Sequence, residues 1–338
     1  ALSDTLREKG LQLEPQRLSR LAEFPMNAVV SLGGCSASFV SPQGLVVTNH
    51  HCVHGSLQFN STRENNLLKH GFLAKSPGEE LSATPGSRIY VTQELTDVTP
   101  QITGQLHEDM SGRERYDTII NAKKSLITQC EKAEGFRCEV YSFYRGLQYF
   151  LIKQLEIRDV RLVYAPAKAI GAYGGDVDNW MWPRHTGDFS FYRGYVGKDG
   201  KPADYSPQNI PYTPTSYLKL NARGVSEGDF VMVIGYPGRT NRYRTAAEVD
   251  NAFNWYYPNA IALRQQLIRT ILASSEESSQ ERISYESTLA GLRNYEKNFQ
   301  GMVEGFAASS MLQDKQSLQR RYVDWAGQRD RRGKSNNR

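Results

Sequence analysis

The sequence predicts a mixed β and α fold, in which an antiparallel β-rich part with a helical insertion is followed by the start of an α-helical domain. Short runs of β-branched and aromatic residues, separated by turn residues, recur along the chain up to Tyr243 and are typical of strands. Residues 97–130 interrupt them with the charge density of an exposed helix. After Tyr243, strand formers become scarce and apolar residues recur at helical spacing. We therefore expect two domains, 1–243 and 244–338.

The first strong element is a β-hairpin. Residues 36–40 and 45–48 are predicted strands, and the Ser-Pro-Gln-Gly segment between them supplies the turn. The second strand leads to His51, and Cys52 follows it directly. A bridge from Cys52 to Cys35 would tie the two strands together, with a loop-entropy gain of roughly 3 kcal/mol. A histidine on such a braced hairpin is held firmly enough to act as a general base.

The other elements follow in chain order. Residues 2–24 contain two short amphipathic stretches that we expect to brace the β-rich part. A helical hairpin inserted between strands accounts for residues 97–130. A loop rich in Gly and Trp, 171–187, leads into a strand, and residues 245–306 have helical periodicity. The remaining strands are predicted at 88–92, 138–144, 148–157, 159–164, 189–196, 217–220 and 229–235.

The four cysteines fall into two pairs that are close in sequence, Cys35 with Cys52 and Cys130 with Cys138. Two short-loop disulfides are compatible with this spacing and would indicate an oxidising compartment. Four buried thiols of a cytosolic enzyme are the alternative. The sequence opens on Ala1 rather than methionine, without a charged and apolar leader, so we expect a signal peptide to have been removed or left outside it.

Zinc is a further alternative, because three histidines crowd around Cys52. They are His50, His51 and His54. Metal sites, however, require ligands whose spacing lets them converge on one point, such as Cys-x-x-Cys, and no second cluster of this kind occurs in the sequence. We therefore expect no metal.

The net charge of +5 is concentrated at the C-terminal end of the sequence. Residues 314–338 contain eight Lys or Arg against three acidic residues, so the remainder of the chain is neutral. Such a basic tail can bind nucleic acid or an anionic lipid surface. Because basic residues alone are a weak signal without a recognised nucleic-acid fold, we interpret the tail as a solvated helix end and expect neither partner. No run of about 18 apolar residues occurs, so no transmembrane helix is expected.

Two long motifs carry a specific resemblance. Residues 32–52 read LGGCSASFVSPQGLVVTNHHC, and residues 174–189 read GGDVDNWMWPRHTGDF. Together they resemble the periplasmic dipeptidyl-peptidases of bacteria, serine exopeptidases of the dipeptidyl-peptidase 7 and 11 type, with similarity from about Leu11 to Phe306. The resemblance implies a chymotrypsin-like double β-barrel that carries the catalytic triad, a helical cap domain over the cleft, and a periplasmic location. It also implies a homodimer and catalysis without metal or organic cofactor.

Two residues match the catalytic base and its partner in this family. His51 would accept the proton of the nucleophile and return it to the leaving amine. Asp188 would accept a hydrogen bond from the other ring nitrogen and stabilise the imidazolium. Asp176 and Asp178 are rivals for this position, and their spacing equally suits a loop that binds a cation. His50 would be a supporting neighbour whose imidazole turns away from the cleft.

Three residues match those that hold the free α-amino group of the substrate. They are Asn179, Trp180 and, in the helical segment, Asn294. An amide oxygen can accept from the ammonium while an aromatic wall excludes water, so that only a chain end fits. The alternative for Trp180 and Trp182 is packing in the core.

The nucleophile is the missing part of the resemblance. Chymotrypsin-like proteases place it in a Gly-x-Ser-Gly context, whose N–H groups also form the oxyanion hole, and this motif does not occur here. Ser36, Ser38 and Ser111 lie near glycines but outside a suitable turn. In the family, the serine and the residue that sets side-chain preference lie far downstream. We therefore expect both in a missing C-terminal half, and this chain alone to be inactive.

With that half, the enzyme would release dipeptides from oligopeptides that have a free N-terminus, by acyl-enzyme serine catalysis. Two other classes of function stay open. A pseudo-peptidase would bind peptide amino ends through Asn179 and Trp180 without cleaving them. An interaction or nucleic-acid module would instead use the basic residues 329–338, and its binding would disappear with salt.

Overall fold

The computed structural model describes residues 2–238, 241, 243–277 and 279–335, and from residue 329 on it describes the backbone only. The chain divides into two compact units. The first unit comprises Ala1–Asn60, Leu67–Ala172 and Gly187–Gly238, and the second comprises Ser61–Asn66, Tyr173–Thr186 and Arg239–Arg338. The domain boundary expected near Tyr243 stays a prediction.

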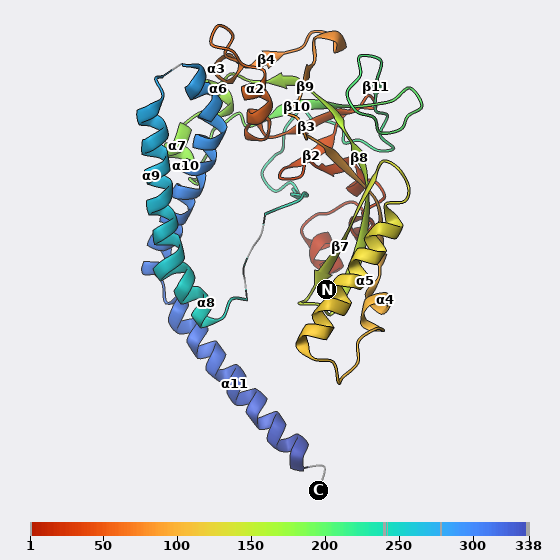
Figure 1. Ribbon diagram of the computed structural model, residues 1–338, viewed down its shortest axis with the longest axis vertical. Coiled ribbons are helices and arrows are strands. Elements are labelled where there is room, and N and C mark those ends of the chain that lie inside the picture. Colours follow the sequence, from red (N-terminus) through yellow and green to blue (C-terminus); the bar gives the residue numbers. More distant parts are fainter. Residues whose placement is uncertain (1, 239–240, 242, 278, 336–338) are drawn as a thin grey trace. The chain divides into compact units, whose positions relative to one another are not determined.

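The first unit is built on one antiparallel sheet, most of whose strands are labelled in Figure 1. Their order is β4-β9-β10-β3-β2-β1-β6-β8-β7, with β5 paired to β9 and β11 paired to β10. The strands are β1 (Val29–Ser31), β2 (Ser36–Phe39), β3 (Leu45–Thr48), β4 (Phe72–Leu73), β5 (Leu81–Ser82), β6 (Ile89–Asp97), β7 (Phe136–Phe143), β8 (Gln148–Ile157), β9 (Asp159–Ala165), β10 (Ser190–Val196) and β11 (Ile210–Pro211). The prediction of an antiparallel β-rich part is confirmed.

The predicted hairpin is confirmed as β2 and β3. Phe39 pairs with Val46 across the two strands, and both side chains are fully buried. Gly44 in the connecting turn has a φ of +67°, and a Cβ there would lie 2.7 Å from the carbonyl oxygen of Tyr212. The turn therefore requires glycine for its backbone conformation and for its close approach to a neighbouring segment.

Strands β8 and β9 are almost continuous, since only Arg158 separates them. Gly194 of β10 packs against the end of β8: a Cβ on Gly194 would lie 3.2 Å from Cδ1 of Ile89 and 3.3 Å from Cγ2 of Ile157. β10 therefore approaches β6 and β8 closely, although neither is its neighbour in the order of the sheet. The fully buried apolar side chains of the whole sheet include Val30, Phe39, Val46, Ile89, Ile157 and Leu162.

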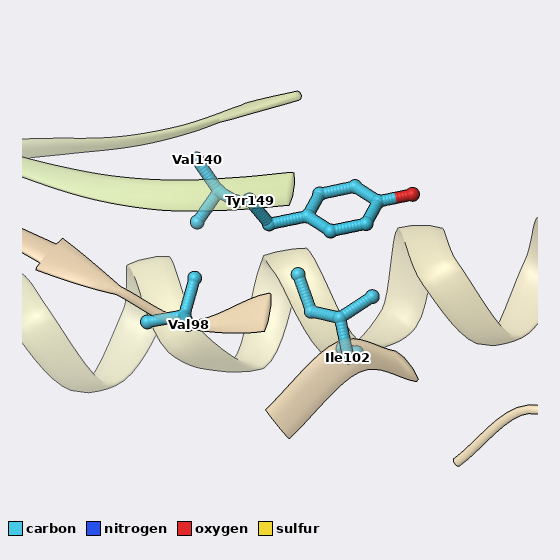
Figure 2. Packing of buried hydrophobic residues seen from close by; sticks show 5 residues of the cluster. Val98, Ile102, Val140 and Tyr149 are labelled. Carbon is cyan, nitrogen blue, oxygen red and sulfur yellow. The ribbon is translucent and has the colours of Figure 1, made fainter. Parts of the chain in front are cut away.

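The predicted helical insertion lies between β6 and β7. It consists of α4 (Thr99–Thr103) and α5 (Gly112–Cys130). Helix α5 begins at a capping box, in which the side chains of Ser111 and Glu114 each bond the backbone N–H of the other residue. An apolar cluster joins the insertion to the strands, as Figure 2 shows for most of its members: Val98, Ile102, Ala122, Val140 and Tyr149.

From Thr245 on, the second unit is helical, as predicted, and a capping box begins its first helix. Aromatic side chains form its core. The ring of Phe253 stacks on that of Phe306 at 4.4 Å, and the ring centroids of Tyr257 and Phe299 are 4.7 Å apart. The elements are α8 (Ala246–Asn251), the π-helical turn η5 (Ala252–Tyr256), α9 (Tyr257–Ser274), α10 (Gln280–Ala307) and α11 (Met311–Ser335).

Short helices and turns complete the chain. The amphipathic stretches expected within residues 2–24 form α1 (Leu2–Glu8) and η1 (Pro15–Ser19). None of the helices in the described ranges has the length and apolar character needed to cross a bilayer. The other short helices and turns of the chain are η2 (Met26–Ala28), η3 (His50–Val53), α2 (His54–Phe59), α3 (Leu67–His70), η4 (Pro77–Glu79), α6 (Lys168–Gly171) and α7 (Gly175–Asp178).

Two of the predicted strands are wrong. Residues 217–220 and 229–235 are irregular, although they are rich in branched and aromatic residues. A strand forms only where a neighbour supplies hydrogen-bond partners. Within the part of the chain that the structure describes, these segments make one backbone bond to a strand, from Leu218 N–H to the Phe39 carbonyl at 2.8 Å. Val233 is fully exposed, so burial does not hold the second segment either.

Candidate active site

Two strands that are neighbours in the sheet bring His51 and Asp188 together in the first unit. β3 ends at Thr48, which lies opposite Ser190 at the start of β10. Because the two strands are antiparallel, the residues after Thr48 and those before Ser190 emerge at the same edge. Nδ1 of His51 consequently lies 2.9 Å from Oδ2 of Asp188. Asp188, rather than Asp176 or Asp178, is thus the carboxylate hydrogen-bonded to this imidazole.

The Asp188 carboxylate accepts further N–H groups, among them the backbone N–H of His50. The backbone N–H of His51 donates to Oδ1 at 3.1 Å, and the Asn49 side chain donates at 3.2 Å to Oδ2 and also to the backbone carbonyl oxygen of Asp188. Burial raises the pKa of Asp188, but the hydrogen bonds and charge of His51 outweigh it and hold the pKa below its ordinary value. An ionised Asp188 accepts the Nδ1–H, which leaves Nε2 of His51 as the basic nitrogen.

The two side chains differ in exposure. His51 is 64% exposed and Asp188 is 23% exposed, so a covered carboxylate orients a reachable imidazole. Among the residues that the structure describes, no serine hydroxyl hydrogen-bonds to His51. Ser36 accepts the backbone N–H of Tyr236 at 2.7 Å, and Ser111 caps α5. These two serines, considered and rejected from the sequence, have structural partners.

Two more histidines, whose rings contact each other, lie near the pair: His50 is buried and His54 is half-buried. The ring of His50 is fully buried, and neither of its nitrogens has a hydrogen-bond partner within the described residues. Burial lowers the pKa of His50, and it lowers the pKa of His54 to about 4. A Cβ on Gly171 would lie 2.4 Å from Cγ of His50, so the ring fills the space that this glycine leaves. Both imidazoles are therefore neutral at pH 7 and act as core side chains.

Both cysteine pairs form disulfides, Cys35 with Cys52 and Cys130 with Cys138. The alternative of four free thiols is therefore wrong. The ligand atoms of Cys35, Cys52 and His51 lie within 4.8 Å of one another, which by distance alone would suit a metal ion. Both sulfurs are in a disulfide, however, and zinc requires thiolates, so this donor set does not fit zinc.

The second unit brings Asn179, Trp180 and Asn294 together. The Asn179 amide donates to Oδ1 of Asn294 at 2.9 Å, and the Trp180 indole N–H donates to the backbone carbonyl of Asn294 at 3.1 Å. Trp180 has a φ of +61°, a left-handed conformation that a bulky residue adopts only when its contacts hold it there. Trp180 is 58% exposed and Trp182 is 92% exposed, so the alternative of core packing is wrong for both.

Cationic side chains surround this cluster. Arg184 donates to the side-chain oxygen of Asn179 at 3.2 Å and to Oγ1 of Thr186 at 3.0 Å. Lys297 of α10 donates to the backbone carbonyls of residues 176 and 177, each at 2.6 Å, and so ties α7 to α10. Arg293 lies 3.6 Å from Asp176. No sequence pattern singled out Arg184 or Lys297, because an arginine in a loop and a lysine on a helix are ordinarily solvated.

The comparison with known families concerns the chain as a whole. The sequence profile described as Peptidase S46 matches residues 1–338. The chain belongs to the peptidase S46 family. An Asp/Glu-specific dipeptidyl-peptidase of Shewanella putrefaciens is 49% identical over 328 residues, which cover 97% of this chain and 44% of that protein. A dipeptidyl-peptidase 7 of Capnocytophaga gingivalis is 37% identical, over 98% of this chain and 47% of its own length.

Solved structures of the family share the fold of this S46 chain. The crystal structure of Porphyromonas endodontalis DPP11 in complex with the dipeptide Arg-Asp matches it with a TM-score of 0.86 at 35% identity, over 97% of this chain and 48% of that one. The same protein in an alternate conformation matches with a TM-score of 0.68. The S46 chain thus spans less than half the length of the relatives that it matches.

Proposed function

We propose that this chain supplies the general base, its orienting carboxylate and the amino-end pocket of a dipeptidyl-peptidase. The observation that carries the proposal is the 2.9 Å contact between Nδ1 of His51 and Oδ2 of Asp188, in a member of the peptidase S46 family. The complete enzyme would release dipeptides from the free amino ends of oligopeptides.

The pair supports acyl transfer to a serine. As the serine oxygen attacks the carbonyl carbon of the second peptide bond, its proton passes to Nε2 of His51, and Asp188 stabilises the resulting imidazolium. The imidazolium then protonates the leaving amine, and the peptide C–N bond breaks to leave a dipeptidyl ester. A water that loses its proton to His51 attacks this ester, and the same proton returns to the serine oxygen as the dipeptide leaves.

The nucleophilic serine would come from outside the segment that residues 1–338 match. The relatives are more than twice as long as that segment, which covers 44% and 47% of two of them. We expect the serine and the pocket for the side chain at the cleaved bond in the remaining part. The bound dipeptides Arg-Asp and Arg-Glu in the Porphyromonas endodontalis structures support peptides as ligands.

Asn179, Trp180 and Asn294 would hold the α-ammonium group of the peptide. An ammonium donates three hydrogen bonds, and amide oxygens with an aromatic wall are suitable partners for it. In the structure, Oδ1 of Asn294 accepts from Asn179, and Oδ1 of Asn179 accepts from Arg184. An arriving ammonium would therefore displace the guanidinium or share the Asn179 oxygen with it.

Three properties of the whole protein complete the proposal. The sheet of the first unit would close into a chymotrypsin-like barrel, because β8 runs into β9 and Gly194 of β10 touches Ile89 and Ile157. The two disulfides support the periplasm, an oxidising compartment. The resemblance to the family supports a homodimer.

Peptide binding without cleavage is the second candidate. It is favoured by one observation, that no serine hydroxyl of the described residues is bonded to His51. The two candidates differ in turnover, since both require Asn179 and Trp180 but only the enzyme requires His51 and a serine.

Labelling with a fluorophosphonate tests the enzyme directly, because the probe reacts only with an activated serine. We expect the complete native protein, with the part that would supply the serine, to be labelled on one serine. The label should disappear in His51→Ala and persist in a control variant of an exposed histidine, His107→Ala. Absence of label from the native protein would contradict the catalytic proposal. Binding of a free-amino peptide with no label would favour the second candidate.

A further inference from the structure

We propose that Asn49 is a positioning residue for the base, which holds the Asp188 carboxylate in the orientation that His51 needs. This inference rests on the proposed function, because it concerns the same pair. Asn49 follows directly on β3, and its backbone is extended, with φ of −74° and ψ of 152°. Its side chain reaches Asp188 where the chain enters β10.

The amide of Asn49 makes two bonds to a single residue. Nδ2 lies 3.2 Å from the backbone oxygen of Asp188 and 3.2 Å from its Oδ2. An amide carries two N–H donors, so each acceptor can receive its own hydrogen. The two bonds together link the backbone of Asp188 to its carboxylate, and rotation of the side chain would break one of them.

The two oxygens of the Asp188 carboxylate accept different hydrogen bonds. Oδ1 accepts the backbone N–H of His51, whereas Oδ2 accepts both the Asn49 amide and Nδ1 of His51. Asn49 and His51 are two residues apart, so one short segment supplies hydrogen bonds to both oxygens of the carboxylate. Asn49 and the 64% exposed His51 imidazole are the side-chain donors to Oδ2 within the described residues, so loss of Asn49 would leave the imidazole as its remaining side-chain partner there.

The groups around Asp188 show why the hydrogen bonds of Asn49 matter for its orientation. The titratable groups that interact with Asp188 or with the buried ring next to it are His51, His50, His54 and Lys168. Burial keeps the rings of His50 and His54 neutral, and the ring nitrogens of His50 have no hydrogen-bond partner within the described residues. The backbone N–H of His50 does hydrogen-bond to Asp188 and helps to lower its pKa. Asn49 therefore contributes a neutral side-chain donor to Oδ2, in addition to the backbone N–H groups that bond Asp188.

The first test compares Asn49→Ala with Asn60→Ala in the purified protein. Asn60 is a matched control, because its amide also donates two hydrogen bonds, to the carbonyls of Ser56 and Ser82, away from the pair. We expect Asn49→Ala to lower kcat about 10- to 100-fold with KM within about twofold, as for loss of a group that only orients the base. Asn60→Ala should lower the thermal midpoint instead and leave kcat within about twofold.

The second test does not need activity. A hydrogen bond from an imidazole Nδ1–H to a carboxylate strongly deshields that proton, which can be followed by NMR and assigned by its loss in His51→Ala. We expect Asn49→Ala to shift or broaden this resonance and Asn60→Ala to leave it unchanged. Asn49→Asp, which keeps the shape but loses the donor, should behave like Asn49→Ala, because two adjacent carboxylates repel.

The outcomes separate the two proposals. An active protein in which Asn49→Ala changes neither kcat nor the resonance overturns the role of Asn49. A change of both that is equally large in Asn60→Ala also overturns it, because the effect would then be general destabilisation. A complete protein without activity whose resonance responds to Asn49→Ala overturns the proposed function and leaves the positioning role intact.

Discussion

His51 and Asp188 are 137 positions apart in the chain, yet Nδ1 of one lies 2.9 Å from Oδ2 of the other. The pairing of β3 with β10 closes this distance, because it sets Thr48 opposite Ser190. The disulfide from Cys35 to Cys52 ties the segment that carries His51 to the start of β2. The pair is therefore held by the sheet rather than by the loop 171–187.

Replacement of Asp188 by Asn should abolish most of the activity. The amide would present an N–H to His51 and favour the wrong tautomer, so we expect kcat to fall by about 10⁴-fold. The KM should change little, since Asp188 orients the base and has no proposed contact with the peptide. Steady-state kinetics measures both, with Asp117→Asn, which affects an exposed ion pair with Arg113, as the control. A loss below about tenfold would mean that Asp188 does not orient the base.

Removal of Asn179 should weaken recognition of the amino end. In Asn179→Ala the ammonium loses an acceptor and Asn294 loses its partner, so we expect kcat/KM to fall about 10- to 100-fold for free-amino peptides. Peptides that are acetylated at the amino end should be poor substrates of both proteins. If the substitution lowers kcat/KM by the same factor for free-amino and acetylated peptides, Asn179 does not recognise the ammonium group.

Replacement of Arg184 by Met should strengthen the binding of free-amino peptides, in contrast to replacement of Asn179. The guanidinium occupies the Asn179 oxygen that the ammonium requires, and two cations in one pocket repel. We expect KM for free-amino peptides to fall about two- to fivefold, the range of a partly screened charge interaction. Binding of a non-hydrolysed peptide by calorimetry provides an independent measurement. An increase in KM would show that Arg184 orients Asn179 for the peptide instead.

Acid should destabilise the first unit through His50 and His54, whose pKa values are lowered by desolvation. The pKa of His54 is lowered from 6.5 to about 4, so between these pH values the unfolded chain binds a proton that the folded one does not. This destabilisation is absent above pH 6.5. It lowers the free energy of unfolding by roughly 3 kcal/mol when the pH has fallen to about 4. The lowered pKa values of His50 and Asp188 act in the same direction.

Urea denaturation between pH 7.5 and 4.5 checks this prediction. The free energy of unfolding should fall with pH in the native protein, and less steeply in His54→Gln, which has no proton to gain. Equal slopes in the two proteins would show that His54 is accessible to protons in the folded state.

Gly171 should not tolerate a side chain. A methyl group there would lie 2.4 Å from the buried ring of His50, so Gly171→Ala should cost about 1–3 kcal/mol of unfolding free energy. Gly112→Ala is the matched control, because a Cβ at the start of α5 meets no atom within 4 Å and should be neutral or stabilising. Equal stability of the two variants would mean that the His50 ring can move aside.

The sequence by itself determined the local elements. The hairpin of β2 and β3, the interrupted helical insertion and the helices after Thr245 all follow from periodicity and turn residues, which report on neighbours in the chain. Two motifs sufficed to indicate the family, which the profile match shows. The cysteine spacing indicated the two pairs, although free thiols and zinc could be set aside only once the disulfides were seen.

Tertiary structure alone decided the contacts between distant residues. Three contacts depend on segments that the fold brings together. They are the hydrogen bond of Asp188 to His51, the two hydrogen bonds of the Asn49 amide to Asp188, and the hydrogen bond of the Arg184 guanidinium to Asn179. Residues 217–220 and 229–235 show the same limit, since their composition favours strands but a strand needs a partner. Periodicity reports which face of an element is apolar, whereas hydrogen bonds between side chains depend on distances that only packing sets.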